Sequence, residues 1–202
     1  MRTFTEHDLD DLAAKLRSGG VAAIPTDTVY GLAARPDHPE AIEAIFRLKA
    51  RPDSLALPVL AATLDDVLRL LGEMSPTAVT LARRFWPGAL TLVLPAPSEL
   101  ARQVGAHDGT VGLRVPALGL TRRLLARSGP LAATSANLHG QPACRSAVEV
   151  RAAFSGQPEL TGVLDGGPSG TEPSTIVAVR DGEVDLLRSG AIPELELRAA
   201  LG

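Results

Sequence analysis

The sequence predicts a single α/β domain built on a mixed, twisted sheet. Short apolar segments alternate with longer segments in which apolar residues recur at helical spacing. The composition is that of a globular chain, with 45% hydrophobic and 3% aromatic residues over 202 positions. Because no change in composition separates a second core, we expect one domain over residues 1–202.

The first elements place a polar loop at the end of a strand. Residues 8–17 have helical spacing and are followed by Ser18-Gly19-Gly20, which ends the predicted helix. The apolar strand 21–24 follows, and Pro25 ends it before a polar loop at residues 26–32. Ligands of open α/β sheets bind beyond the carboxyl ends of strands, so this loop is a candidate ligand contact.

The later elements continue the alternation. Helical spacing predicts further helices at residues 39–48, 63–71, 76–85, 119–127 and 146–154. Apolar runs predict strands at residues 57–61, 90–94, 111–115, 131–133, 162–164, 175–179 and 184–187. Asp181 and Gly182 form a natural hairpin turn between the last two strands.

Composition and missing motifs exclude several classes of protein. The chain has neither an apolar run of about 20 residues nor a signal-like N-terminus, so we expect a cytoplasmic protein without membrane contact. A net charge of −3 argues against a domain whose main task is gripping a phosphate backbone. The phosphate-loop, dinucleotide-binding and His-Glu-x-x-His motifs are absent from the sequence, and the histidines lack ligand spacing. We therefore predict no metal site built from side chains.

The rarity of lysine in this chain draws attention to the two lysines that are present. Only two of the 20 basic residues, Lys15 and Lys49, are lysines. Lys15 belongs to a solvated helix face, whereas Lys49 and Arg51 end a predicted helix before Pro52, which holds them on a turn. Two cations at this spacing could bind one polyphosphate. The alternative is that they merely complement the helix dipole.

Three other polar segments follow predicted apolar elements. The loop 26–31 could hold a small amino acid, although an ordinary Thr turn would look the same. Residues 134–137 could bind an anion or could cap a helix. The glycine-rich segment 166–175 could close over a phosphate or could be a plain connector. Arg114 and Arg188 each end a predicted strand and could point into the same crevice.

Taken in order, these segments resemble the YrdC family of L-threonylcarbamoyladenylate synthases over about residues 12–192. The matching motifs, each written as it stands here, are Pro25-Thr26-Asp27-Thr28-Val29-Tyr30-Gly31-Leu32, Lys49-x-Arg51, Trp86-Pro87-Gly88 with Leu90-Thr91, Gly112-Leu113-Arg114-Val115-Pro116, Ser135-x-Asn137 and Pro173-Ser174-Thr175-Ile176-Val177. The resemblance implies the family's fold, a twisted open sheet with flanking helices around a concave cleft, similar to the DHBP synthase fold.

The resemblance also implies a nucleotidyltransferase reaction. L-threonine, bicarbonate and ATP, with Mg²⁺ arriving on the ATP, would give threonylcarbamoyl-AMP and pyrophosphate. A partner transferase complex would then modify the adenosine beside the tRNA anticodon; direct contact with tRNA stays open. Implied ATP-binding residues are Lys49, Arg51, Ser135, Asn137, Ser174 and Arg188, of which Lys49 and Arg51 would be catalytic. Implied threonine-binding residues are Thr28, Tyr30, Arg114 and Thr134.

Some features depart from the family or leave rivals open. Many relatives carry a cation and a proline where this chain has Leu55 and Ala56, which puts the details of that loop in doubt. Longer members of the family have an extra C-terminal domain, and we expect no additional C-terminal domain here. A YciO-like paralogue would share the fold but lack the Lys-x-Arg and Ser-x-Asn pairs. A non-enzymatic RNA-binding module would use the helix arginines, Arg83, Arg84, Arg122, Arg123 and Arg127. Hydrogenase maturation proteins contain a similar domain but also zinc-finger cysteines, whereas this chain has Cys144 alone.

Overall fold

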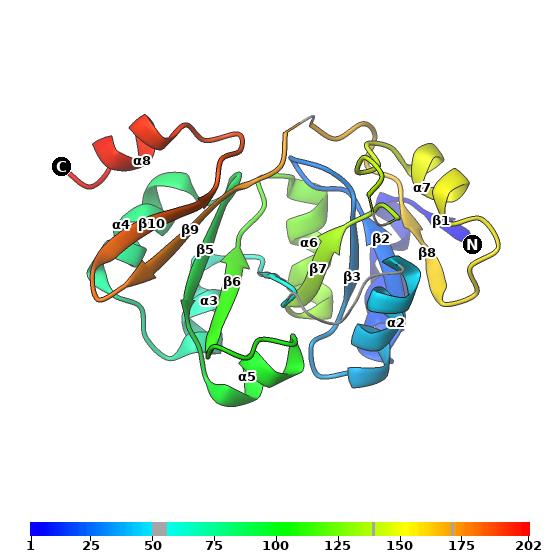
Figure 1. Ribbon diagram of the computed structural model, residues 1–202. Helices are drawn as coiled ribbons and strands as arrows, with labels where there is room; N and C mark the ends of the chain where they lie inside the picture. The colour runs from blue at the N-terminus through cyan, green and yellow to red at the C-terminus, as the bar shows by residue number, and fades with distance from the viewer. Residues whose placement is uncertain (50–55, 139, 171) are drawn as a thin grey trace.

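The computed structural model describes residues 1–49, 56–138, 140–170 and 172–202, and one large mixed sheet runs through them (Figure 1). Its strands, in spatial order, are β1-β8-β2-β3-β7-β4-β6-β5-β9-β10. Their bounds are β1 (Arg2–Phe4), β2 (Val21–Ile24), β3 (Gly31–Ala34), β4 (Val59–Leu60), β5 (Leu90–Pro95), β6 (Thr110–Arg114), β7 (Leu131–Ser135), β8 (Leu160–Leu164), β9 (Thr175–Arg180) and β10 (Glu183–Arg188).

The helices flank this sheet (Figure 1). They are the short 3-10 helix η1 (Glu6–Asp8) and the α-helices α1 (Leu9–Arg17), α2 (Pro39–Lys49), α3 (Leu64–Leu71), α4 (Pro76–Phe85), α5 (Ser98–Gln103), α6 (Gly119–Ser128), α7 (Ala147–Ala153) and α8 (Glu194–Ala199). Three of them begin at a serine or threonine whose side chain accepts a hydrogen bond from the first turn: Thr63, Ser75 and Ser146. Among the described residues, none of the helices has the length and apolar character needed to cross a bilayer.

The sheet is mixed, as predicted. β1, β8 and β2 run parallel, β3 and β7 follow antiparallel, and β5 runs parallel to β9. β3 lies between β2 and β7, so Leu32 pairs with Ala23 on one side and Thr134 on the other. This arrangement brings the loop after β2 next to the end of β7, although about a hundred residues separate them in the sequence.

Two apolar clusters cover opposite faces of the sheet. Leu12 of α1 and Leu124 of α6 pack with Ala22 and Ile24 of β2 in one cluster. Ile45 and Leu48 of α2 pack with the alternate residue Ala23 in the other. Because successive strand side chains point to opposite faces, neighbouring alanines of β2 serve different cores. The helices α2 and α6 accordingly lie on opposite sides of the sheet (Figure 1).

Most predicted elements are confirmed to within two residues, and the differences are specific. The helix at 76–85 and the strand at 21–24 have the predicted bounds. Asp181 and Gly182 make the expected hairpin turn, with φ of 52° and 85°. The predicted loop 26–32 was wrong at its end, because Gly31 and Leu32 already belong to β3. β1, α5 and α8 were not predicted.

Candidate functional site

The turn between β2 and β3 is ordered by its own hydroxyls. Thr26 Oγ1 accepts hydrogen bonds from the amides of Thr28 at 3.1 Å and Val29 at 3.2 Å, and it donates to Val29 O at 2.6 Å. Thr26 is 6% exposed and Thr28 is 3% exposed. These bonds form the turn that a threonine at this position commonly makes. Thr28 Oγ1 accepts a further hydrogen bond from Arg114.

Arg114 is a buried cation held from three sides. It is the last residue of β6 and is 5% exposed. Its Nη1 donates to Thr28 Oγ1 at 2.8 Å and its Nε donates to Gly88 O at 2.9 Å. Its Nη2 lies 2.8 Å from Asp27 Oδ2 in an ion pair. Burial lowers the pKa of Arg114, Asp27 opposes that shift, and the positive charge of Arg188 adds to it.

Lys49 is a second buried cation, at the end of α2, and it contacts the predicted Ser-x-Asn pair. Its Nζ donates to Ser135 O at 2.6 Å, to Asn137 Oδ1 at 2.8 Å and to Asn137 O at 3.2 Å. Asn137 Oδ1 also accepts from Ser135 Oγ at 2.6 Å, and its Nδ2 donates to Leu138 O and Gln141 O. Asn137 thus joins the lysine to the loop that follows β7.

Ser174 and Arg188 form a third group. Arg188 ends β10, and its Nη2 donates to Ser174 O at 2.8 Å and to Ser174 Oγ at 3.1 Å. Ser174 Oγ lies 2.9 Å from Thr91 Oγ1 of β5. Burial lowers the pKa of Arg188. The predicted location of both Arg114 and Arg188 at strand ends is confirmed.

Tyr30 joins the turn after β2 to the glycine-rich segment. Its hydroxyl donates to Gly167 O at 2.8 Å and accepts from Gly166 N at 3.3 Å. Burial raises the pKa of this phenol. Gly170 lies so close to the turn that an added Cβ would be 2.6 Å from Asp27 O. The segment therefore rests against the turn, while its closing over a ligand stays a prediction.

Backbone hydrogen bonds connect the three groups. Ala136 N, beside the Lys49 group, donates to Tyr30 O at 2.8 Å. Thr175 N, beside Ser174, donates to Ala89 O at 3.0 Å, next to the Gly88 that holds Arg114. The positive charge of Arg188 contributes to lowering the pKa of Arg114. The result is a connected, cation-bearing set of strand ends.

For the remaining predicted site residues, the structure gives a position or no description at all. Arg51 and Leu55 lie outside the described residues, and Ala56 is exposed. Thr134 lies half-buried in β7, directly before Ser135. Asp27, which the sequence prediction did not select, pairs with Arg114. Its position on a loop just past the end of a strand was the available signal.

Two of the arginines considered for an RNA-binding surface form ion pairs with carboxylates of the same chain. Arg123 Nη2 lies 2.6 Å from Glu6 Oε1, and Arg127 Nε lies 2.8 Å from Asp10 Oδ1. Both join α6 to the N-terminal segment that contains η1 and α1. This pairing lowers the net positive charge of that surface and weakens the RNA-binding alternative.

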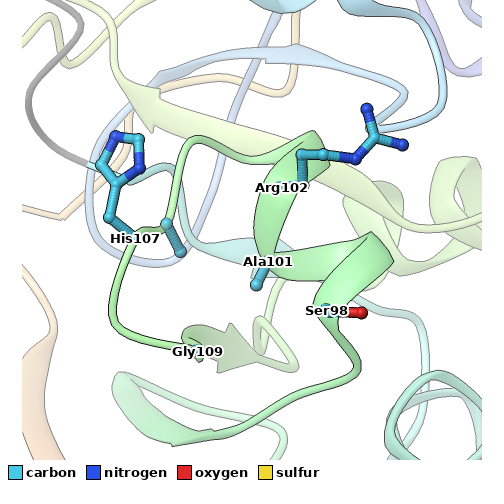
Figure 2. A pocket seen from close by; sticks show the side chains of 6 residues that line it. Ser98, Ala101, Arg102, His107 and Gly109 are labelled. Carbon is cyan, nitrogen blue, oxygen red and sulfur yellow. The ribbon is translucent and has the colours of Figure 1, made fainter.

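A surface cavity of about 270 Å³ lies apart from the predicted site residues, none of which lines it. Figure 2 shows that it lies beside α5 and the segment leading to β6, where Ser98, Ala101, Arg102, Ala106, His107 and Gly109 form its lining. Within the described ranges, His, Cys, Asp and Glu side chains do not gather in groups of three that could hold a metal ion.

An open mixed sheet with buried cations at the end of a strand, Arg114, and of a helix, Lys49, defines an α/β domain suited to anionic ligands. The family model Sua5_yciO_yrdC, with the description "Telomere recombination", matches residues 14–190. The chain therefore belongs to the Sua5/YciO/YrdC family.

Individual relatives agree with this assignment. The chain is 40% identical over 193 residues to a threonylcarbamoyl-AMP synthase of Bacillus subtilis, covering 94% of this chain and 55% of the relative. Pyrococcus abyssi Sua5, solved in complex with L-threonine, is similar with a TM-score of 0.92 and 34% identity, covering 100% of this chain and 61% of that one. Escherichia coli YciO has a TM-score of 0.84 and 25% identity, with coverages of 95% and 97%. The chain thus spans only a little more than half the length of the first two relatives.

Proposed function

We propose that this chain is a threonylcarbamoyl-AMP synthase. It would convert L-threonine, bicarbonate and ATP to threonylcarbamoyl-AMP and pyrophosphate, for the threonylcarbamoyladenosine modification of tRNA. The observation that carries the proposal is the contact of buried Lys49 with both Ser135 and Asn137, in a fold shared with a threonine-bound Sua5. The family resemblance associates these residues with ATP.

The nucleotide would occupy the end of the sheet where Lys49, Ser135, Asn137, Ser174 and Arg188 lie. The family resemblance adds Arg51, which is outside the described residues. ATP phosphates carry negative charge that the buried ammonium of Lys49 offsets more strongly than an exposed cation does. Arg188 offers directed N–H groups, whereas Lys49 acts as a point charge. Lys49 already donates to neutral oxygens, so a phosphate would have to join or replace them.

L-Threonine would bind on the side of Thr28, Tyr30, Arg114 and Thr134. Its amine attacks the carboxyl carbon supplied by bicarbonate, with loss of water, to give a carbamate. A carbamate oxygen then attacks the α-phosphorus of ATP, and pyrophosphate leaves with the electron pair of the broken P–O bond. Both partners are anions, so cations that hold them together lower the barrier without a protein nucleophile.

Mg²⁺ is the metal that we propose to accompany ATP. It commonly binds through phosphate oxygens and water, with few protein ligands. When bound, it would neutralise part of the polyphosphate charge. Asp27 and Asp165 are the carboxylates flanking the turn and the glycine-rich segment, and Asp27 is engaged by Arg114. Phosphates would therefore supply most of the ligands.

The product would be passed to a threonylcarbamoyl transferase that acts on tRNA, and we propose a cytoplasmic location for this exchange. Direct contact of this chain with tRNA is a further expectation. The YciO-like alternative shares the fold, so fold alone does not separate the two. The Lys49 contacts with Ser135 and Asn137 favour the synthase.

The test is pyrophosphate release from ATP by the purified protein, with and without L-threonine and bicarbonate. We expect release to need both co-substrates. Lys49→Ala and Asn137→Ala should lower it by roughly a hundredfold or more, because each removes a contact of the phosphate side. Lys15→Ala is the matched control, since Lys15 is the other lysine and its side chain is 40% exposed.

The outcomes separate the alternatives. Threonine-dependent release that survives Lys15→Ala and is lost in Lys49→Ala supports the synthase and the assigned role of the lysine. A wild-type protein that releases no pyrophosphate in response to threonine, when a known synthase does so in parallel, contradicts the proposal. A YciO-like or RNA-binding role would then be the better account.

A further inference from the structure

Asp27 connects three parts of the fold through one carboxylate. Its Oδ2 lies 2.8 Å from Arg114 Nη2, at the end of β6. Its Oδ1 accepts a hydrogen bond from Ala117 N at 2.9 Å, in the turn that leads into α6. The Asp27 side chain is 20% exposed, so the ion pair is largely removed from water. Salt screens such a pair less than it screens a surface pair.

The backbone of Asp27 is equally confined. Gly170 approaches so closely that a Cβ there would lie 2.6 Å from Asp27 O and 3.1 Å from Thr28 O. Thr28, the next residue, receives the Nη1 hydrogen bond of Arg114. The carboxylate therefore sits where the turn after β2, the end of β6 and the glycine-rich segment meet.

The geometry of Arg114 explains what the carboxylate adds. Gly88 O fixes Nε and Thr28 Oγ1 fixes Nη1, each through a neutral oxygen. Asp27 supplies a negative charge at the remaining nitrogen. Burial disfavours the charged guanidinium and Arg188 repels it, so the charge of Asp27 offsets part of both costs and favours this orientation of Arg114.

We propose that Asp27 is a positioning residue for the threonine side of the site: it holds the Arg114 guanidinium in the orientation that binds L-threonine. This inference rests on the proposed synthase function. Both oxygens of Asp27 are engaged by protein atoms, so the residue acts through Arg114 and does not contact the substrate. Its loss should therefore affect threonine binding more than ATP binding.

The first experiment compares Asp27→Asn and Asp27→Glu with Asp108→Asn. Asp108 is a close chemical match, because its Oδ1 accepts from Thr110 N at 3.0 Å and its Oδ2 lies 3.0 Å from Arg180 Nη2. That pair is on the surface, with side chains 56% and 61% exposed. We expect both Asp27 variants to raise the KM for threonine by roughly tenfold or more, with the KM for ATP within about twofold of wild type. Asp108→Asn should leave both constants unchanged.

The second experiment reads Arg114 directly and needs no activity. In a proton–nitrogen correlation spectrum of arginine side chains, the Arg114 Nε–H should be protected from exchange, because it is buried and bonded to Gly88 O. The signal is assigned by its loss in Arg114→Lys. We expect it to shift and exchange faster in Asp27→Asn, and to stay unchanged in Asp108→Asn.

Each outcome decides the matter. Equal rises in both KM values, or no rise for threonine, overturn the positioning role, and so does loss of folding in both Asp27 variants, which would assign the residue to stability alone. An Arg114 signal that Asp27→Asn leaves unchanged overturns it as well. If the wild type has no synthase activity, the threonine role fails together with the proposed function. The arginine signal would then still show whether Asp27 holds Arg114.

Discussion

Lys49 and Arg114 are both buried cations, 3% and 5% exposed, but the fold holds them in different ways. Among the described residues, Lys49 donates hydrogen bonds to Ser135 and Asn137, in the chain at the end of β7. Arg114 is held by the turn after β2, through Asp27 and Thr28, and by Gly88 before β5. Both cations thus depend on contacts between distant parts of the chain, but Arg114 depends on two separate segments, the turn after β2 and the residue before β5.

Among the substitutions that test this difference between the two cations, Arg114→Lys should have the largest effect. Lysine keeps the positive charge but lacks the planar guanidinium, whose three nitrogens contact Thr28, Gly88 and Asp27 at the same time. We expect a loss of about 3 kcal/mol in the free energy of unfolding, with threonine-dependent kcat/KM down roughly a hundredfold. Denaturant unfolding, followed by the fluorescence of the single tryptophan, Trp86, measures the first quantity. Arg180→Lys, at the surface, is the control, and equal losses in both variants would contradict the assignment.

Tyr30→Phe tests the segment that lies between the two cation groups, because the Tyr30 hydroxyl binds residues 166 and 167. Removing its hydroxyl leaves Gly166 N and Gly167 O without their partner, for a loss of about 1.5 kcal/mol. Hydrogen exchange at residues 166–170 should become faster in the variant. Unchanged exchange there would mean that the phenol does not anchor the segment.

The same phenol predicts a pH dependence with a definite sign. Burial raises the pKa of Tyr30 above its usual value of 10.0, so the folded chain keeps the proton to higher pH than the unfolded chain. Stability should therefore fall as the pH rises from about 10 through the folded pKa. Tyr30 is the single tyrosine, so tyrosinate absorbance reports on it alone. A titration midpoint at or below 10 would refute this expectation, and Tyr30→Phe should abolish the signal.

Ser135→Ala should have a smaller effect, confined to the lysine side. The variant loses the hydrogen bond from Ser135 Oγ to Asn137 Oδ1, while Lys49 keeps its bond to the Ser135 backbone oxygen. We expect a loss of about 1 kcal/mol and a rise of a few-fold in the KM for ATP. The KM for threonine should not change, and a larger effect on threonine than on ATP would contradict the division into two sides.

Ser169→Ala should have the smallest effect. Ser169 Oγ is buried and makes no hydrogen bond within the part of the chain that the structure describes. Replacing an unsatisfied hydroxyl with a methyl group removes a cost, so stability should stay within about 0.5 kcal/mol or rise slightly. Thermal unfolding measures this change. A loss above about 1 kcal/mol would show that the hydroxyl has a partner.

Sequence patterns predicted elements that are stabilised locally. Helix α4 begins at Ser75 with Pro76 in its first turn, and both signals are visible in the sequence. Strand β3 was missed because Gly31-Leu32-Ala33-Ala34 has little intrinsic β-propensity, and its pairing with β2 and β7 determines its conformation. The three-residue strand β1 depends in the same way on β8.

The same distinction applies to the site. The family resemblance assigned Lys49, Ser135 and Asn137 to the nucleotide, and that role stays a prediction. The structure adds that Lys49 contacts the other two residues. The role of Asp27 could not be predicted, because its partner Arg114 is chosen by the order of strands in the sheet. Sequence motifs indicate which residues belong to the site. Which of their side chains contact each other is decided by the pairing of strands that are distant in the sequence.

The position of Ser174 and Arg188 late in the chain has a consequence during protein synthesis. A nascent chain made only as far as β8 already contains Lys49 and Arg114, but it lacks β9 and β10. Ser174 precedes β9, which pairs with β5, and Arg188 ends β10. A partly translated chain would therefore lack part of the proposed nucleotide site, so the proposed turnover would have to wait until β10 has been made.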